Sequence, residues 1–325
     1  MPDIAIHAEG LTKHFGETKA VDGVDLTVNT GTVTALLGPN GAGKTTTVRM
    51  LTTLLRPDGG HASVAGFDLV KQPNEVRTKI GLTGQDTAVD ELLTGRENLE
   101  MIGRLARMEK TAVKPRAHDL LNRFDLADAA DRPAGTYSGG MRRRLDLAAS
   151  MIAEPDILFL DEPTTGLDPR SRLGMWDLIE ELVGRGTTVL LTTQYLDEAD
   201  QLADEVVVID HGRVIARGTS DELKDQVGGE RLELKLVDSS AIERAQSLIE
   251  GKNCEVVERD IDERTITAAL TDGPKQIARL IDLLEENEIE IDEVFVHRPT
   301  LDDVFLTLTG EHVEHADEDS LEETR

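Results

Sequence analysis

The chain of 325 residues is predicted to have an α/β fold followed by a smaller α+β domain. Up to about residue 220, short apolar runs alternate with longer stretches that have helical spacing. Continuous apolar runs of this kind are typical of parallel strands that are buried on both faces of a sheet. Beyond residue 222 the pattern changes to a smaller set of alternating strands and amphipathic helices. The buried runs are Val33–Leu37, Ile157–Leu160, Val189–Thr193 and Val206–Ile209.

A glycine-rich loop carries the strongest chemical signal. It follows the buried run Val33–Leu37 and precedes a helical pattern that continues through Leu55. Glycines let such a loop wrap closely, so that backbone N–H groups and the start of the helix face anionic oxygens. In a G-x-x-x-x-G-K-[ST] loop, the lysine reaches the β- and γ-phosphates and the next hydroxyl binds Mg²⁺. The sequence therefore predicts a nucleoside triphosphate site at Gly38, Pro39, Asn40, Gly41, Ala42, Gly43, Lys44, Thr45 and Thr46.

Two carboxylates end the apolar run Ile157–Leu160. In phosphoryl-transfer sites, a strand of this kind holds its first acid near Mg²⁺ and leaves the second free to act on water. We therefore expect Asp161 to be a metal ligand and Glu162 to polarise the attacking water as general base. Alone, the pair could be a solvated strand end, but the phosphate-binding loop in the same chain favours the catalytic interpretation.

Between Gln85 and Tyr137 the apolar residues take helical spacing, which predicts a mostly helical subdomain over about residues 86–150. Near its end, a hydroxyl and two glycines precede a helix that runs through Met151, and this combination makes another anion site. One nucleotide does not need two such sites from one chain. We therefore expect the second site to bind the γ-phosphate of a nucleotide held by another subunit. Its residues are Ser138, Gly139 and Gly140.

Three arginines follow that segment and could contact a phosphate or a partner. Successive residues on a helix point in different directions, so an exposed basic face is expected for at least two of them. They are Arg142, Arg143 and Arg144.

After residue 222 the elements follow the order strand, helix, strand, strand, helix, strand, which is the pattern of a small ferredoxin-like domain. A short helix over Thr300–Thr309 follows, with Thr300 as its expected N-cap. The acidic residues 311–325 are expected to form a disordered tail. We therefore divide the chain into residues 1–222, 223–310 and 311–325. The expected elements of the second domain are Arg231–Val237, Ala241–Ile249, Glu255–Arg259, Thr265–Leu270, Pro274–Leu284 and Ile289–Val296.

The composition limits the classes of function. A net charge of −28 opposes binding to nucleic acid or to an anionic lipid surface, because both would be repelled. The single cysteine, Cys254, cannot form an internal disulfide and favours a reduced, intracellular setting. The N-terminus lacks the features of a secretory signal, and no apolar run approaches the roughly 20 residues that span a bilayer. We expect a chain that is soluble by itself and is not inserted directly into a membrane.

The acidic residues are spread along the whole chain. Such a distribution is compatible with an ordinary well-solvated surface. It favours adaptation to concentrated salt, where screening removes the self-repulsion of a densely acidic shell.

Together these motifs resemble the ATP-binding subunit of ATP-binding-cassette (ABC) transporters over residues 4–220. The resemblance implies a P-loop NTPase fold, of the ABC nucleotide-binding type, in which the loop from Gly38 to Thr46 is the Walker A motif. It also implies that Phe15 stacks on adenine. Gln85 takes the position of the Q-loop glutamine, which would lie near the metal and sense the phosphate.

Three further motifs belong to the same resemblance. The segment from Ser138 to Gly140 is similar to the signature motif, and Asp161 with Glu162 is similar to the Walker B pair. The segment from Gly166 to Asp168 is similar to the D-loop, which implies that Asp168 lies among the nucleotide-binding residues.

The chain departs from the family pattern at several positions. Gln194 stands where the family usually has a switch histidine that touches the γ-phosphate. A glutamine amide can donate to that oxygen but cannot carry a charge, so its contribution to hydrolysis should be smaller. Tyr137 and Met141 replace the usual residues beside the signature motif and leave its helix-end donors intact. Phe15 stands where tyrosine is common, which retains stacking.

Two segments resemble the daunorubicin-resistance-type drug exporters within this family. They run from Thr192 to Asp200 and from Pro299 to Phe305, so this resemblance extends to the C-terminal domain. It implies that two copies of the chain close around two ATP–Mg²⁺. It also implies a separate integral membrane permease, which would place the chain at the inner face of the cell membrane. The expected activity is ATP hydrolysis that drives export of a small, amphipathic or drug-like compound.

Two other functions stay open on the sequence. The first is a soluble cassette ATPase in translation or DNA repair, which the single phosphate loop and the lack of sustained heptads disfavour. The second is a nucleotide-binding regulator without turnover. The presence of Glu162 disfavours that role, and Gln194 in place of the usual histidine leaves it possible.

Overall fold

The structure of the chain is a computed structural model that describes residues 3–84, 88–227, 230–250, 252, 254–270 and 274–309. It divides into one unit that extends to Ser220 and a second that begins at Asp221. Each unit has its own apolar core. The predictions for Gln85 and for the tail of residues 311–325 fall outside the described residues.

A six-stranded sheet at the centre of the first unit confirms the four predicted buried strands. Its order is β10-β9-β3-β8-β7-β6. The five strands from β9 to β6 are parallel, and β10 pairs antiparallel with β9 at the edge. The carboxyl ends of β3, β7 and β8 therefore lie side by side. The strands are β3 (Val33–Leu37), β6 (Ile80–Thr83), β7 (Ile157–Asp161), β8 (Thr188–Thr193), β9 (Glu205–Asp210) and β10 (Arg213–Gly218).

A second sheet in this unit was not expected, because residues 4–29 lack the continuous apolar runs used to find the central strands. Its four strands pair antiparallel in the order β2-β1-β4-β5. In β2, buried and more exposed residues alternate, as in a sheet with one covered face. Helix α1 (Lys44–Leu51) contacts strands of both sheets, and their apolar faces share one core. The strands are β1 (Ile4–Phe15), β2 (Thr18–Asn29), β4 (Gly59–Val64) and β5 (Phe67–Asp68).

Helix α1 is shorter than the predicted pattern, which continued through Leu55. It ends at Leu51, with Thr52 as its C-cap. Thr53 has a φ of 62°, in the left-handed region that stops an α-helix. Leu54 is largely exposed, so the apolar spacing beyond Leu51 does not belong to a buried helix face.

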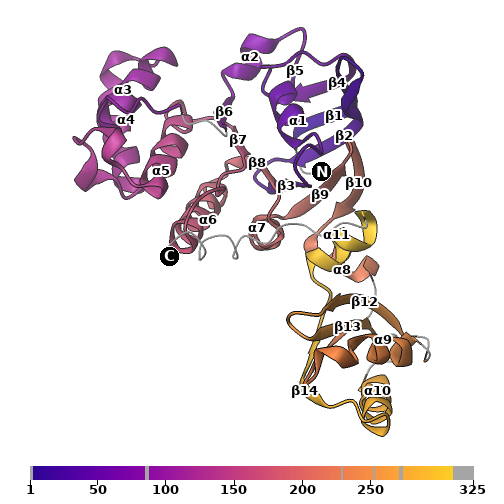
Figure 1. Cartoon of the computed structure of the whole chain (residues 1–325). Helices are drawn as coiled ribbons and strands as arrows, with labels where there is room; N and C mark the ends of the chain where they lie inside the picture. Colours follow the sequence, from indigo (N-terminus) through magenta and orange to yellow (C-terminus); the bar gives the residue numbers. More distant parts are fainter. Residues whose placement is uncertain are drawn as a thin grey trace. The chain divides into compact units, whose positions relative to one another are not determined.

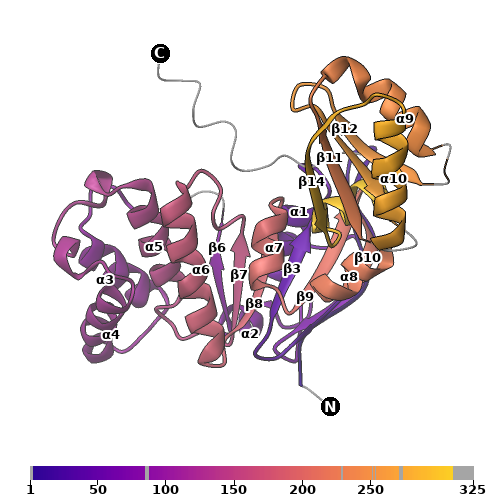
Figure 2. The same ribbon diagram turned by 90° about the horizontal axis from the view of Figure 1, so that it is seen from below.

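The predicted helical subdomain is present as three main helices, which Figure 1 shows grouped apart from the two sheets. Helix α3 begins with a capping box, in which the Thr94 hydroxyl and the Glu97 carboxylate satisfy each other's backbone N–H groups. The helices are α3 (Gly95–Leu105), α4 (Lys110–Arg123) and α5 (Gly139–Ser150), with the short turns η1 (Ala127–Ala129) and η2 (Ala134–Thr136) between α4 and α5. The remaining helices of the unit are α2 (Pro73–Arg77), α6 (Pro169–Gly184) and α7 (Leu196–Leu202), and Figure 2 shows α6 and α7 beside the central sheet.

The second unit has the predicted element order. Its four strands pair antiparallel in the order β12-β13-β11-β14. Side chains of β11 and of helices α9 and α10 form its apolar core. Helix α11 has Thr300 as its N-cap, as predicted, because the Thr300 hydroxyl accepts from the Asp303 N–H at 3.2 Å. The elements are α8 (Ser220–Val227), β11 (Arg231–Leu236), η3 (Ser239–Ala241), α9 (Ile242–Glu250), β12 (Glu255–Asp260), β13 (Thr265–Ala269), α10 (Pro274–Glu286), β14 (Ile291–His297) and α11 (Leu301–Thr309).

Within the described ranges, every helix is too short or too polar to cross a membrane.

Candidate functional site

The glycine-rich loop connects β3 to α1 and is fixed on both sides by backbone. A Cβ at Gly38 would collide with the carbonyl oxygen of Ile209, and one at Gly43 would collide with the carbonyl oxygen of Ala20. Gly43 also has a φ of 107°, which L side chains rarely adopt. The Gly212 N–H donates to the Ala42 carbonyl at 2.9 Å, so the turn between β9 and β10 holds the loop as well. The loop is therefore a rigid backbone cradle.

Lys44, the first residue of α1, lies buried inside this loop. Its Nζ donates to the carbonyl oxygens of Gly38 at 2.6 Å and Pro39 at 3.1 Å. The same Nζ is 3.6 Å from a carboxylate oxygen of Glu162. Burial lowers the pKa of the Lys44 ammonium, and the charge of Glu162 opposes that shift. A positive charge is thus held at the start of α1, where the helix dipole also favours an anion.

Two hydroxyl groups contact the carboxylate of Asp161, the last residue of β7. Asp161 Oδ1 accepts from the Thr45 hydroxyl at 3.0 Å and from the Thr192 hydroxyl at 2.6 Å. The carboxylate is almost fully buried. The structure therefore brings together Thr45 and Asp161, although they are 116 positions apart along the chain, because β3 and β7 flank β8 in the sheet.

Glu162 has an unusual backbone. Its φ is 52°, a left-handed conformation that is costly for a residue other than glycine. Its N–H donates to both the hydroxyl and the carbonyl oxygen of Thr192, each at 3.1 Å. The side chain is only 11% exposed and points to the same place as the Lys44 ammonium. Thr192, which sequence reasoning did not single out for this site, thus orients both acids.

Two other predicted site residues follow or end strands of the same unit. Gln194 directly follows β8, and its side chain is half-buried. Phe15 ends β1 and is 52% exposed, with the Lys13 ammonium 5.9 Å from the centre of its ring. The hairpin that carries Phe15 also includes Ala20, whose carbonyl lies against Gly43. An exposed ring on this hairpin is free to stack on a flat ligand.

The second anion motif stands at the start of α5. Ser138 is the N-cap of this helix, and its hydroxyl accepts from the Met141 N–H at 3.3 Å. Ser138 and Gly139 are exposed, whereas Gly140 is buried against Ser171. A cavity of about 460 Å³ includes Gly139, Glu162 and residues of the following loop among its lining.

Asp168 is the N-cap of α6. Its carboxylate accepts from the Ser171 N–H at 3.0 Å and from the Ser171 hydroxyl at 2.6 Å, and these hydrogen bonds lower its pKa. Because Ser171 packs against Gly140, the D-loop and the start of α5 are neighbours in the same chain.

Tyr137, which departs from the family pattern, is part of the subdomain core. Its hydroxyl donates to the Ala129 carbonyl at 2.6 Å, and its ring is buried. The hydroxyl also leaves no room for a Cβ at Gly95. The departure therefore affects packing behind the signature segment and leaves the donors of α5 unchanged.

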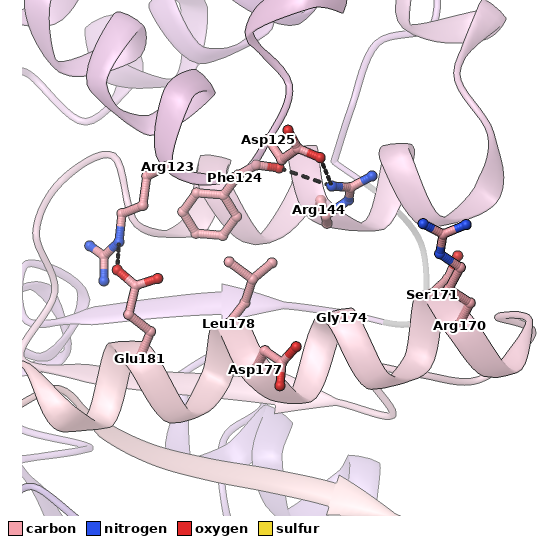
Figure 3. Close-up of a pocket in the computed structure, with 10 residues that line it drawn as sticks. All are labelled: Arg123, Phe124, Asp125, Arg144, Arg170, Ser171, Gly174, Asp177, Leu178 and Glu181. Carbon is pink, nitrogen blue, oxygen red and sulfur yellow. Dashed lines mark hydrogen bonds and ion pairs between the residues drawn. The ribbon is translucent and has the colours of Figure 1, made fainter.

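The three consecutive arginines of α5 point in different directions, as expected for a helix. Arg142 and Arg144 are partly exposed, with Arg142 near Glu91 at 3.6 Å. Figure 3 shows Arg144 in a surface pocket between α5 and α6, where it donates to Asp125 at 3.2 Å. Arg143 is buried and donates to backbone around Glu162. The sequence of three consecutive arginines did not indicate which of them would be buried.

A buried carboxyl joins the loop after Glu162 to α7. Glu198 is fully buried and accepts from the Thr164 hydroxyl at 2.8 Å and from Trp176 Nε1 at 3.3 Å. Burial raises the pKa of the Glu198 carboxyl, and these hydrogen bonds oppose the shift only in part. The charged groups that act on it are Asp197 and Arg143.

This pKa shift predicts a pH-dependent stability. Between the carboxyl pKa of the unfolded chain and the raised pKa of folded Glu198, the folded state binds more protons, so stability falls as pH rises. The Glu198→Gln variant lacks this loss. In thermal melts, the Tm of the variant minus the Tm of the wild type should increase as pH is raised from about 5 to about 8. A difference that stays constant with pH would contradict the raised pKa.

Taken together, a rigid glycine loop, a buried lysine and two strand-end carboxylates define a P-loop nucleotide-hydrolysing site on a parallel sheet. The ABC transporter family profile matches residues 21–165, and the profile of the C-terminal domain of DrrA1-3-like ATP-binding proteins matches residues 218–309.

Relatives and solved structures agree with that class. The chain is 53% identical to the daunorubicin resistance ATP-binding protein DrrA2 of Streptomyces coeruleorubidus, over 98% of each chain. It is 52% identical to the daunorubicin/doxorubicin resistance ATP-binding protein DrrA of Streptomyces peucetius, over 99% of this chain and 96% of that one. A crystal structure of the ADP conformation of an ATP-binding cassette matches 68% of this chain and 92% of its own, with 30% identity and a TM-score of 0.62.

The chain belongs to the DrrA-type ATP-binding proteins of the ABC transporter family. The family expected from the motifs is thereby confirmed. A more distant relative, 38% identical over 94% of each chain, is the Nod factor export ATP-binding protein I of Ralstonia nicotianae. The names of these three relatives refer to resistance or export and not to translation or DNA repair.

Proposed function

We propose that this chain binds and hydrolyses ATP to energise a membrane exporter of drug-like or other small amphipathic compounds. The observation that carries the proposal is the convergence of Lys44 with Glu162 and of Thr45 with Asp161 at the end of one parallel sheet. This arrangement has a cation for the phosphates and a carboxylate for the water, as phosphoryl transfer requires. The names of the close relatives supply the link to drug resistance.

The loop from Gly38 to Thr46 binds the phosphates through its backbone N–H groups. On ATP binding, the Lys44 ammonium exchanges its contacts with the Gly38 and Pro39 carbonyls for β- and γ-phosphate oxygens. Glu162, 3.6 Å from that ammonium, is then next to the γ-phosphate and acts as the general base for water. Gln194 donates its amide to the γ-phosphate, and Phe15 stacks on the adenine ring.

Thr45 and Asp161 fit a Mg²⁺ ion. Their oxygens lie 3.0 Å apart, and a hydroxyl with a buried carboxylate is the hard oxygen set that Mg²⁺ prefers. When bound, the ion would supply positive charge that neutralises the phosphates. Gln85 is proposed as a further residue near the ion, and it lies outside the described residues.

Two copies of the chain close around two nucleotides. The helix start at Ser138, Gly139 and Gly140, whose first two residues are exposed, then binds the γ-phosphate held by the other copy, and Asp168 lies at the same junction. ADP lacks the γ-phosphate, so ATP binds the closed dimer better than ADP does and can drive closure. Hydrolysis reopens the dimer.

The chain acts with a separate integral membrane permease, through which it is held at the cytoplasmic face of the membrane. We assign residues 1–222 to the ATP-binding domain and 223–310 to a ferredoxin-like domain. The strand order β12-β13-β11-β14 with all pairs antiparallel supports the latter assignment.

Transport in inverted vesicles of native membranes tests this function. Vesicles that contain the wild-type chain should accumulate daunorubicin when ATP is added, and vesicles with Glu162→Gln in its place should not. Equal accumulation of daunorubicin with both chains would contradict the proposed coupling between hydrolysis and export.

The acidic surface is proposed to be an adaptation to a cytoplasm with concentrated salt. With a net charge of −28, the acidic side chains repel one another in dilute buffer, and added salt screens this repulsion. The Tm should therefore rise between dilute and molar KCl, by about 1–2 °C for each kcal/mol of repulsion that is removed from a chain of this length. Calorimetry over this range measures the effect, and a Tm that does not respond to KCl would contradict it.

A further inference from the structure

Arg143 is the buried arginine of helix α5, and it forms four hydrogen bonds to backbone carbonyls of the described residues. Its Nε donates to Pro163 at 2.8 Å. Its Nη2 donates to Asp161 at 3.1 Å and to Glu162 at 2.8 Å. Its Nη1 donates to the carbonyl of Gly84, the residue directly after β6, at 2.7 Å. One guanidinium thus contacts three consecutive carbonyls centred on the proposed general base.

The backbone at this point requires such support. Glu162 has a φ of 52°, and a residue other than glycine persists in this region only when its surroundings fix it. On the N–H side, Thr192 supplies two acceptors. On the carbonyl side, the donor is Arg143, whose planar fork matches several acceptors at fixed angles.

The charge of Arg143 is balanced one helical turn further along α5. Its Nη1 lies 3.7 Å from an oxygen of Asp146, which is also buried. Asp146 accepts from the Ala88 N–H at 2.9 Å. Arg143 therefore contacts Gly84, the last described residue before Gln85. Asp146 contacts Ala88, the first described residue after it.

We infer that Arg143 is a positioning residue for ATP hydrolysis, which fixes the backbone from Asp161 to Pro163 so that the Glu162 carboxylate stays beside Lys44. This inference rests on the proposed role of Glu162 as general base. The contacts of Arg143 near the base are to backbone carbonyls, so it acts through the backbone of Glu162.

The position of Arg143 on α5 also connects the placement of Glu162 to the start of that helix. Ser138, the N-cap of α5, is about one and a half turns before Arg143 on the same rigid helix. A movement of the helix start, where the partner's nucleotide would bind, therefore reaches the backbone of Glu162 through a single side chain. Contact with the second nucleotide and the placement of the base in the same chain are linked in this way.

The neighbouring Arg144 is a matched control. It is the same residue type on the same helix, and it also donates to a backbone carbonyl, that of Phe124, at 3.3 Å. Figure 3 shows it directed to the surface pocket beside α6, and its acidic partner is the exposed Asp125. If hydrolysis only requires an arginine on α5, substitution of either residue should lower the rate. If hydrolysis requires the positioning contacts, only substitution of Arg143 should lower it.

Steady-state hydrolysis of MgATP and binding of a fluorescent ATP analogue by the full chain test the inference. Arg143→Lys retains the charge but cannot contact all four carbonyls. It should lower kcat by about 10- to 100-fold, because a small displacement of the base is costly. Its Kd for the analogue should stay within about threefold of the wild type, since the phosphate loop is untouched. Arg144→Lys should leave kcat and Kd unchanged.

A second variant keeps the inference testable if Arg143→Lys does not fold. Asp146→Asn retains an acceptor for the Ala88 N–H and removes the counter-charge, and it should lower kcat with little change in Kd. A wild-type kcat in either folded variant, or an equal loss in Arg144→Lys, would overturn the inference. Glu162→Gln, assayed in parallel, separates the two claims. Near-normal hydrolysis by that variant would overturn the proposed base, and an inactive Glu162→Gln beside a fully active Arg143→Lys would overturn only the positioning role.

Discussion

Replacement of Glu162 by glutamine is expected to lower kcat for ATP hydrolysis by about 10²–10⁴. The amide keeps the size of the side chain and its place near Lys44, but it cannot accept a proton from water. ATP binding should persist, because the phosphate loop and Lys44 are unchanged. Since reopening requires hydrolysis, the variant should also accumulate as a dimer when ATP is added, which size-exclusion chromatography measures.

Glu154 is a suitable control for this substitution. It also has a positive φ, of 53°, but its side chain is 73% exposed and its acidic group is near Arg116 on the surface. Glu154→Gln should hydrolyse ATP as the wild type does. If Glu162→Gln binds ATP and retains near-normal turnover, another group activates the water.

Replacement of Lys44 by alanine is expected to act earlier, on binding. The ammonium is 4% exposed and lies inside the loop, so its removal deletes charge-assisted hydrogen bonds to the phosphates. Each such bond is worth about 1.5–3 kcal/mol, so the loss of two lowers kcat/KM by about 10²–10⁴. Kinetics at varied MgATP and binding of a fluorescent ATP analogue measure the change.

Lys44→Arg distinguishes charge from shape at this position. The guanidinium retains the charge, but it is larger and planar, and the loop backbone around Lys44 is rigid. It should restore little of the activity. An alanine variant with wild-type affinity for ATP would show that the loop does not bind the phosphates through this residue.

Much of the central sheet was predictable because its strands are buried on both faces. Val33–Leu37 and Ile157–Asp161 are fully buried in the structure, and continuous apolar runs of this kind have few alternative explanations. The antiparallel sheet of β1, β2, β4 and β5 was missed, since strands with one exposed face carry only a weaker, alternating signal. The end of α1 was also misplaced, because apolar spacing alone does not reveal a left-handed residue such as Thr53.

The proposed members of the site come from motifs in the sequence, whereas the contacts that support them do not. Lys44, Thr45 and Asp161 belong to motifs whose spacing already indicates a phosphate site. Thr192 and Arg143 act by donating hydrogen bonds across elements that are far apart in the chain. Their partners are a strand-end carboxylate and backbone carbonyls, and only the three-dimensional arrangement identifies them.

An ATP-hydrolysing subunit of a membrane exporter should be bound to its permease in the cell. Affinity purification of this chain from its native membranes, in molar salt and mild detergent, tests for that complex. We predict that an integral membrane protein with several spans is recovered with it at near-equal stoichiometry. Recovery of the chain alone, or with ribosomal or DNA-repair proteins, would contradict that expectation and assign the ATPase to a function outside transport.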